Sequence, residues 1–216
     1  MLSADALSFQ EFMNRESLSI ATLHGAVFEF LRNRQDVVVF GAQAVNAYTG
    51  EPRMTQDIDV MALRGADLAE ELRLYLSVGK ARRRHRFYIA MRVRVIKGGL
   101  GYRLYQVQKT GDRHLVDIRQ VETLPENRPF EGVLVMAPES LVVSKVIAYY
   151  QRQGKPKAGT DWRDLALLLL AFPELKVESG VVLAGLRAAR VEEAVISLWR
   201  KIVATPIETD DEDEDF

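Results

Sequence analysis

The stretch that most constrains the fold of this chain covers residues 37–62, VVVFGAQAVNAYTGEPRMTQDIDVMA. It opens with an apolar, β-branched run at 37–40, which has the length expected of a buried strand. Gly41 ends that strand, and good helix formers follow as far as Gly50, a residue type common just past a helix C-terminus. A short loop then leads into a second apolar strand over 57–61. The stretch therefore predicts strand, turn, helix and strand in close succession.

Two carboxylates lie in the second strand, which reads Asp57-Ile58-Asp59-Val60-Met61. Residues two apart on a strand point to the same face, so Asp57 and Asp59 are expected side by side. Ile58 and Val60 are then expected to face the core. Two adjacent carboxylates repel each other unless a cation lies between them. The pattern therefore indicates a site for a divalent, oxygen-preferring ion such as Mg²⁺.

A third acidic residue interrupts a later apolar run, HLVDIR at 114–119. A lone aspartate inside a short strand is costly to bury without a partner. That cost disappears if Asp117 faces Asp57, Asp59 and a metal ion. Asp112 is a nearby alternative, but it follows a glycine and fits a turn better. Asp117 is therefore the expected third carboxylate.

This order of elements resembles the DNA polymerase β-type nucleotidyltransferase superfamily: a strand, a glycine turn, a helix, a loop with Arg53 and Thr55, and then Asp-x-Asp. Within it, the chain is most similar to the AbiEii-type abortive-infection and toxin nucleotidyltransferases. The resemblance implies that Gly41, Ala42 and the following helix hold nucleotide phosphates, because helix N-termini favour anions. The family usually has Gly-Gly or Gly-Ser where this chain has Gly-Ala. Arg53 is expected to bind the γ-phosphate or to pair with Asp57, and Thr55 to bind phosphate or cap the loop.

The same resemblance implies that Asp57, Asp59 and Asp117 are the catalytic residues and hold Mg²⁺ or Mn²⁺. Two such ions about 3.5–4 Å apart can stabilise both the attacking and the leaving oxygens of an in-line displacement. Asp117 is also the candidate general base for the incoming hydroxyl. Asp-x-Asp alone is a weak signal, since glycosyltransferases also use it to hold a metal–nucleotide sugar. The glycine turn, Arg53, Thr55 and the third aspartate favour the nucleotidyltransferase interpretation.

A second region carries Pro-Glu-Ser-Leu at 138–141, then Lys145 and Asp161-x-x-Asp164. It resembles the second signature region of the AbiEii-type enzymes, where a lysine and an aspartate on helices complete the nucleotide site. By that resemblance Lys145 contacts triphosphate oxygens, and Asp161 or Asp164 orients the lysine or the metal. The alternatives are structural: Asp161 would be a charge at a helix N-terminus, and Asp164 a partner in a surface salt bridge. The resemblance covers about residues 37–171.

The order of elements predicts an α+β fold, a mixed sheet of the polymerase β-like nucleotidyltransferase type with flanking helices, followed by a C-terminal helical bundle. We predict helices over 2–35, 42–48, 64–78, 138–153, from 160 onward, 179–190 and 191–204, and strands over 37–40, 57–61, 87–96, 102–109 and 114–119. A loop at 124–132 is expected to separate a nucleotidyltransferase domain, residues 1–124, from a helical part, residues 125–205. Residues 206–216 are expected to form a disordered acidic tail.

Composition narrows the class of protein. Hydrophobic residues make up 48% of the chain, which is enough for a core, and the absence of cysteine excludes disulfides and thiolate sites. The N-terminus lacks the pattern of a signal peptide, and no apolar run approaches a membrane span. A soluble cytoplasmic protein that binds no membrane is therefore expected.

The formal net charge of −1 conceals an uneven distribution. Eleven Lys or Arg and one acid lie between Lys80 and Arg113, whereas residues 208–215 hold seven acids and no base. Removing those seven negative charges from a total of −1 leaves a formal +6, so the body is basic. The 80–113 region, with its interleaved tyrosines, is either a solvated sheet face or a surface for a polyanion, the triphosphate or RNA.

Three functions stay open. In the leading one, the protein transfers a nucleoside monophosphate from an NTP to a hydroxyl acceptor, for which family likeness favours RNA such as a tRNA 3′ end. The setting would be a toxin–antitoxin or phage-defence system, with a cognate antitoxin as partner. The second is modification of a small molecule such as an aminoglycoside, which would require an acidic acceptor pocket. The third is a non-catalytic nucleotide- or RNA-binding module, which the three intact aspartates disfavour.

Overall fold

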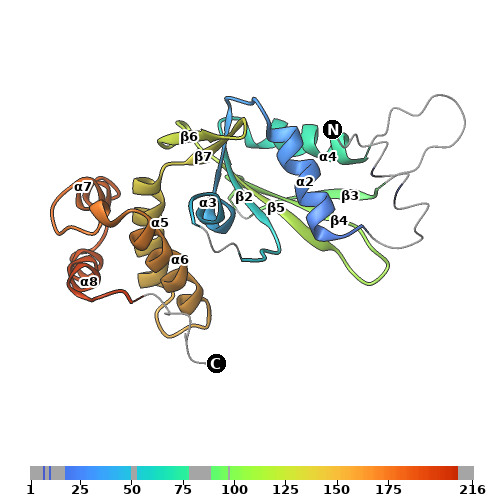
Figure 1. Ribbon diagram of the computed structural model, residues 1–216. Helices are drawn as coiled ribbons and strands as arrows, with labels where there is room; N and C mark the ends of the chain where they lie inside the picture. Colours follow the sequence, from blue (N-terminus) through green and yellow to red (C-terminus); the bar gives the residue numbers. More distant parts are fainter. Residues whose placement is uncertain are drawn as a thin grey trace, which may run out of the picture. The chain divides into compact units, whose positions relative to one another are not determined.

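The computed structural model describes residues 7, 10, 18–49, 53–77, 89–96 and 98–208 (Figure 1). The chain forms two compact units, one of residues 1–47 and 52–136 and the other of residues 48–51 and 137–216. Several predicted segments lie outside the described residues: most of 2–17, the basic loop 80–86, the first two residues of the strand predicted at 87–96, and the tail from 209 onward.

The described part of the first unit contains a seven-stranded mixed sheet in the order β3-β4-β5-β2-β1-β7-β6. Its strands are β1 (Val37–Phe40), β2 (Ile58–Ala62), β3 (Met91–Val95), β4 (Gly101–Gln106), β5 (Arg113–Gln120), β6 (Asn127–Phe130) and β7 (Val133–Met136). β2 runs parallel to β5 and β1 parallel to β7, and the other neighbours are antiparallel. The predicted mixed α+β architecture is confirmed.

One face of this sheet is the main core. Helices α2 (Ile20–Leu31) and α4 (Gly65–Ser77) contribute buried leucines to it, together with Val37 and Val39 of β1. Along β2, Ile58, Val60 and Ala62 are buried, while the residues between them are only half-buried. This alternation is the period of two expected of a strand with one apolar face. It leaves the other face of β2 for the carboxylates.

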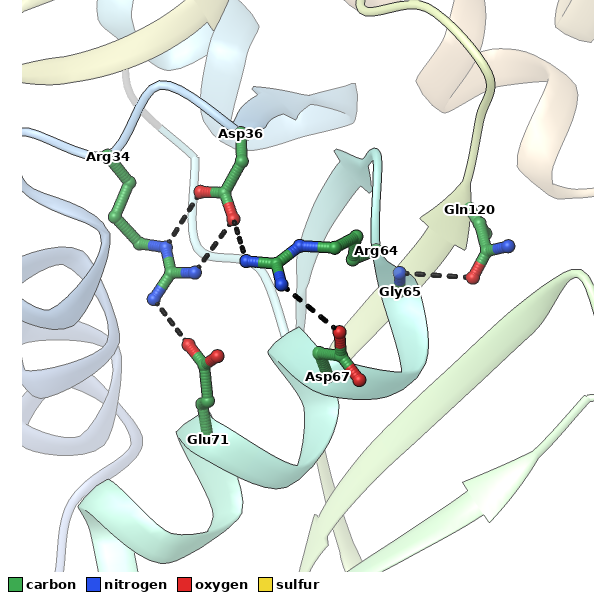
Figure 2. Close-up of polar contacts among 7 residues, drawn as sticks. All are labelled: Arg34, Asp36, Arg64, Gly65, Asp67, Glu71 and Gln120. Atoms are coloured by element: carbon green, nitrogen blue, oxygen red, sulfur yellow. Dashed lines mark hydrogen bonds and ion pairs between the residues drawn. The ribbon is translucent and has the colours of Figure 1, made fainter.

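An ionic network lies between the turn before β1 and helix α4 (Figure 2). Arg34 donates through Nε and Nη2 to both oxygens of Asp36, at 2.9 and 2.8 Å, and through Nη1 to Glu71 at 2.7 Å. Arg64 lies between Asp36, at 3.9 Å, and Asp67, at 3.4 Å. The fork of the Arg34 guanidinium suits such two-point binding of a carboxylate. The network therefore connects the start of β1 with α4.

Residues 124–132 are not simply a loop, because β6 and β7 extend the sheet beyond residue 124. β7 carries the apolar run VLVM and pairs with β1, with Val135 opposite Val39. Glu131 and Gly132 both have positive φ, 48° and 85°, and form the tight turn between β6 and β7. Pro129 is tolerated because β6 is the edge strand, where a missing N–H leaves no ladder hydrogen bond unmade.

The second unit is helical, which confirms the predicted C-terminal bundle. Its elements are α5 (Pro138–Gln151), α6 (Lys157–Ala171), the 3₁₀-helix η1 (Pro173–Leu175), α7 (Val181–Ala188) and α8 (Glu193–Ala204). α5 packs against α6, α7 and α8, and Trp199 of α8 is fully buried. α6 begins at Lys157, earlier than the predicted start at residue 160. Among the described residues, no helix is both long and apolar enough to cross a bilayer.

Candidate active site

The predicted carboxylates come together on strands β2 and β5. These strands run parallel with Asp59 directly beside Asp117 in register, flanked by the buried pair Ile58 and Val116. Asp57 immediately precedes β2 and, like Asp59, is half-buried. Because neighbours in register on one sheet face lie side by side, Asp59 and Asp117 form the base of the candidate site.

A β-bulge in β5 adds a fourth residue, His114, to this group. Leu104 of β4 pairs with Val116, but the next residue, Tyr105, pairs with His114, so Leu115 is an extra residue in β5. In a regular strand, residues three apart point to opposite faces. The extra residue reverses the alternation of side chains at this point, so His114 lies on the same sheet face as Asp117. We had not predicted a role for His114, because the sequence shows the strand but not the bulge.

His114 contacts two of the aspartates. Its Nδ1 lies 3.2 Å from Oδ2 of Asp57, and its Nε2 lies 3.4 Å from Oδ1 of Asp117. The carboxylates of Asp117 and Asp57, in that order, outweigh burial and raise the pKa of His114 to about 9. Burial acts to raise the pKa of Asp117, but contacts from His114 and Arg103 reverse this and hold that pKa below its ordinary value. Arg103, on β4, donates from Nε to Asp117 Oδ1 at 2.7 Å.

The donor set fits a divalent cation. Asp57, His114 and Asp117 each offer one ligand atom, and these atoms lie within 4.8 Å of one another. Carboxylate oxygens and a neutral imidazole nitrogen are ordinary ligands of divalent ions. Asp59 lies beside Asp117 in the same register. Asp57, His114 and Asp117 therefore form a candidate metal site, and the ligand role predicted for Asp59 stays a prediction.

Gly41 lies directly against Asp59. It begins helix α3 (Gly41–Tyr48) with φ +71°, and a Cβ built on it would collide with Oδ2 of Asp59. Glycine is needed here for both reasons, since it takes positive φ readily and has no side chain. The structure thus places the start of α3, with Ala42 as its second residue, next to the carboxylates. Phosphate binding by Gly41 and Ala42 remains a prediction.

Side chains of α3 hold the loop that precedes the aspartates. Gln43 donates from Nε2 to the hydroxyl oxygen of Thr55. Asn46 donates from Nδ2 to the carbonyl of Arg53 at 2.8 Å and accepts from the Arg53 N–H at 3.2 Å. These bonds support the loop-fixing alternative for Thr55. They position the backbone of Arg53, and its contact with phosphate remains a prediction.

The second unit holds the other predicted residues in a buried ionic cluster. Lys145 lies 2.6 Å from Asp164 Oδ2 and 3.7 Å from Asp161 Oδ1, and Arg152 contacts Asp161 at 2.7 Å. Asp164 is 1% exposed, so the surface salt-bridge alternative is wrong. Asp161 is 3% exposed and lies beyond the first turn of α6, so it is not an N-terminal helix charge. Lys145, Asp161 and Asp164 are buried while Arg152 is partly exposed, so the buried carboxylates have cationic partners, as burial of charge requires.

Bases of the 80–113 region that the structure describes contact groups of their own unit. Arg92 and Arg94 contact Asp112 at 2.8 and 2.7 Å, and the Arg94 guanidinium also stacks over the ring of Tyr105. Arg113 donates to the carbonyl of Leu18 at 2.7 Å. Asp112 therefore balances part of this basic surface. Both interpretations of the region stay open.

The mixed sheet, the glycine turn between β1 and α3, and the aspartates on β2 and β5 have the arrangement expected of a nucleotidyltransferase fold. The family model described as "Nucleotidyl transferase AbiEii toxin, Type IV TA system" matches residues 27–211. The chain belongs to this family and is a nucleotidyltransferase, as its motifs predicted.

Solved structures with TM-scores above 0.5 share the fold at low sequence identity. The Megavirus polyadenylate synthase is 14% identical with a TM-score of 0.55; the match covers 71% of this chain and 32% of that chain. JHP933 from Helicobacter pylori is 12% identical with a TM-score of 0.51, covering 87% of this chain and 92% of that chain. The antibiotic-resistance factor ANT(2'')-Ia is 16% identical with a TM-score of 0.47, covering 84% and 95%. A comparison with curated protein sequences gave no match.

Proposed function

We propose that the protein transfers a nucleoside monophosphate from an NTP to a hydroxyl of RNA, such as a tRNA 3′ end, as the toxin of a toxin–antitoxin pair. The observation that carries the proposal is the alignment of Asp59 with Asp117 across parallel strands, with Asp57 on the same side. Carboxylates grouped on one half-buried sheet face are the ligands that divalent cations prefer, which favours an active site over a binding module.

In this proposal Asp57, Asp59 and Asp117 hold Mg²⁺ or Mn²⁺. Such ions, when bound, supply positive charge to the reacting phosphoryl group. The lowered pKa of Asp117 keeps its carboxylate ionised at neutral pH, which suits a metal ligand. A lowered pKa also makes a weaker base, so the ligand role of Asp117 is favoured over the general-base role.

The proposed nucleotide-binding residues of the first unit are Gly41, Ala42, Arg53 and Thr55, near the aspartates, and those of the second unit are Lys145, Asp161 and Asp164. Backbone N–H groups at the start of α3 would meet the phosphates, as helix N-termini favour anions. Lys145 would contact phosphate oxygens, with its charge oriented by Asp164 at 2.6 Å and by Asp161. The short Lys145–Asp164 contact supports the orienting role of Asp164 over a direct contact with metal.

RNA is the proposed acceptor, bound through the basic 80–113 region, and a cognate antitoxin is the proposed protein partner. The description of the family as a toxin of a type IV toxin–antitoxin system supports the second of these. Eleven bases against one acid in the 80–113 region support the first. The proposed location is the cytoplasm, where the NTP and RNA are found.

The test is transfer of label. The protein is incubated with each labelled NTP in turn, Mg²⁺ and total cellular RNA, beside Asp57→Ala/Asp59→Ala and a control, Asp67→Asn, which changes an exposed acid of α4. Label in RNA from the wild type and the control, but not from the double variant, supports the proposal and identifies the donor. Label in small molecules alone would exclude RNA, and no transfer together with no metal-dependent NTP binding would exclude catalysis.

A further inference from the structure

The candidate metal site differs from a set of carboxylates in containing an imidazole. The β5 bulge brings His114 to the face of Asp117, and its ring nitrogens lie close to two carboxylates. Bulges disrupt the strand ladder locally and are over-represented beside active sites, where they redirect a side chain. The aspartates alone do not require this bulge, because Asp57, Asp59 and Asp117 share a face without it.

We propose that His114 is itself a metal ligand through Nε2, and that the site is therefore a mixed nitrogen–oxygen site which prefers Mn²⁺ to Mg²⁺. This inference rests on the metal site of the proposed function, at Asp57 and Asp117, and specifies which ion that site takes.

The two ring nitrogens of His114 have different surroundings. Nδ1 lies 3.2 Å from Oδ2 of Asp57, which is the usual second partner of a metal-bound histidine: the non-ligating N–H donates to a carboxylate and fixes the ring. Nε2 is buried and has no hydrogen bond of normal geometry within the described part of the chain, although Oδ1 of Asp117 is 3.4 Å away. A divalent cation that replaces the proton on Nε2 would lie between this nitrogen and Oδ1 of Asp117, where it could accept a lone pair from each.

The nature of the ligands then determines the ion. Mg²⁺ is bound in proteins by oxygen ligands at near-ideal octahedral geometry and keeps several waters. An imidazole nitrogen favours first-row transition ions, and among these Mn²⁺ also suits carboxylates. A ligand set that joins the His114 imidazole to the Asp117 carboxylate, with Asp57 holding the ring through Nδ1, therefore matches Mn²⁺ better than Mg²⁺.

The experiment uses the full chain with Mn²⁺ alone. Pulsed electron paramagnetic resonance of bound Mn²⁺ detects coupling to a directly bonded ¹⁴N, which a purely structural histidine would not give. The chain has three histidines, His24, His85 and His114. The expected result is nitrogen coupling in the wild type and in the control His85→Gln, and its loss in His114→Gln. Circular dichroism checks the fold of each variant, and the wild-type spectrum is informative without any of them.

Calorimetric titration with Mn²⁺ and with Mg²⁺ gives a second readout. We expect tighter binding of Mn²⁺ by the wild type, and in His114→Gln a loss of Mn²⁺ affinity of about 10- to 100-fold with a smaller loss for Mg²⁺. Bound Mn²⁺ without nitrogen coupling, or an unchanged Mn²⁺/Mg²⁺ ratio in His114→Gln, would overturn the role of His114 and leave a carboxylate site. Failure of the wild type to bind either ion would instead overturn the metal site of the proposed function.

Discussion

Asp59 on β2 and Asp117 on β5 occupy the same register position of two parallel strands. Ile58 and Val60 on either side of Asp59, and Val116 and Ile118 on either side of Asp117, are buried in the core. The packing that fixes the two strands thus also fixes the separation of the carboxylates.

Removing either carboxylate should abolish activity without unfolding the protein. We expect Asp59→Asn and Asp117→Asn each to lower nucleotidyl transfer about 100-fold or more, the scale for losing one preorganised electrostatic group. Both variants should stay folded, but Asp117→Asn should lose more stability than Asp59→Asn, because Asp117 accepts a 2.7 Å hydrogen bond from Arg103 and has a lowered pKa. Initial rates and melting curves test this, with Asp67→Asn as control; transfer by Asp59→Asn at the wild-type rate would contradict it.

Gly41 should be intolerant of any side chain. Gly41→Ala adds a Cβ at φ +71° that collides with Asp59, so we expect lower stability, by about 1–2 kcal/mol from the left-handed backbone alone, and loss of transfer. Gly154→Ala is the matched control, because its φ is +76° but no atom lies within 4 Å of the added Cβ. It should lose a similar amount of stability and keep its activity. Equal activity losses in both variants would show that backbone strain alone is responsible.

Asp36 should make the protein sensitive to acid. Hydrogen bonds from Arg34 outweigh burial and hold the pKa of Asp36 below its ordinary value of 3.8 (Figure 2). A carboxyl with a lowered folded-state pKa contributes stability that is present above its unfolded-state pKa and is lost as the pH falls through the folded value. Urea unfolding at pH 7 and pH 3 should therefore show a smaller pH dependence in Asp36→Asn than in the wild type.

Arg34→Gln, which removes the partner, should reduce this pH dependence in the same way. If both variants lose stability between pH 7 and pH 3 as steeply as the wild type, the Arg34–Asp36 pair is not a source of acid sensitivity.

The effects of substitutions at Lys145 and Asp164 on the free energy of unfolding should not be additive. Asp164→Ala leaves Lys145 buried without its nearest partner, and breaking a buried pair in this way costs about 3–5 kcal/mol. Lys145→Met/Asp164→Leu removes both charges and should be closer in stability to the wild type than Asp164→Ala is. Urea unfolding measures each variant. Glu193→Gln, which alters an exposed pair with Arg200, is the control and should leave the free energy of unfolding nearly unchanged.

The sequence predicted the elements whose signals are local. The apolar run before Gly41, the helix after it and the alternation around Asp59 are each visible within a few residues, and the structure has them as β1, α3 and β2. The burial of Ile58 and Val60 follows from the same alternation. The C-terminal helices were predicted from apolar periodicity in the same way, with only their ends misplaced.

Features that depend on strand pairing were missed. His114 reaches the site only because Leu115 is an extra residue opposite β4, which no residue pattern within β5 reveals. Two prolines and a glycine within 124–132 predict a loop, and only the edge position of β6 permits Pro129 in a strand. The burial of Asp161 and Asp164 could not be predicted from the sequence either, because it depends on contacts with Lys145 of α5 and with Arg152 at the end of that helix.

The central claim is that Asp59 and Asp117 serve nucleotidyl transfer, and the most direct test compares NTPs labelled at the α- and γ-phosphates. With a divalent ion and RNA, we expect the wild type to transfer α-label but no γ-label, because the nucleoside monophosphate moves and pyrophosphate leaves. Asp59→Asn should transfer neither. Transfer of γ-label alone, or α-label transferred equally by the wild type and Asp59→Asn, would contradict the account.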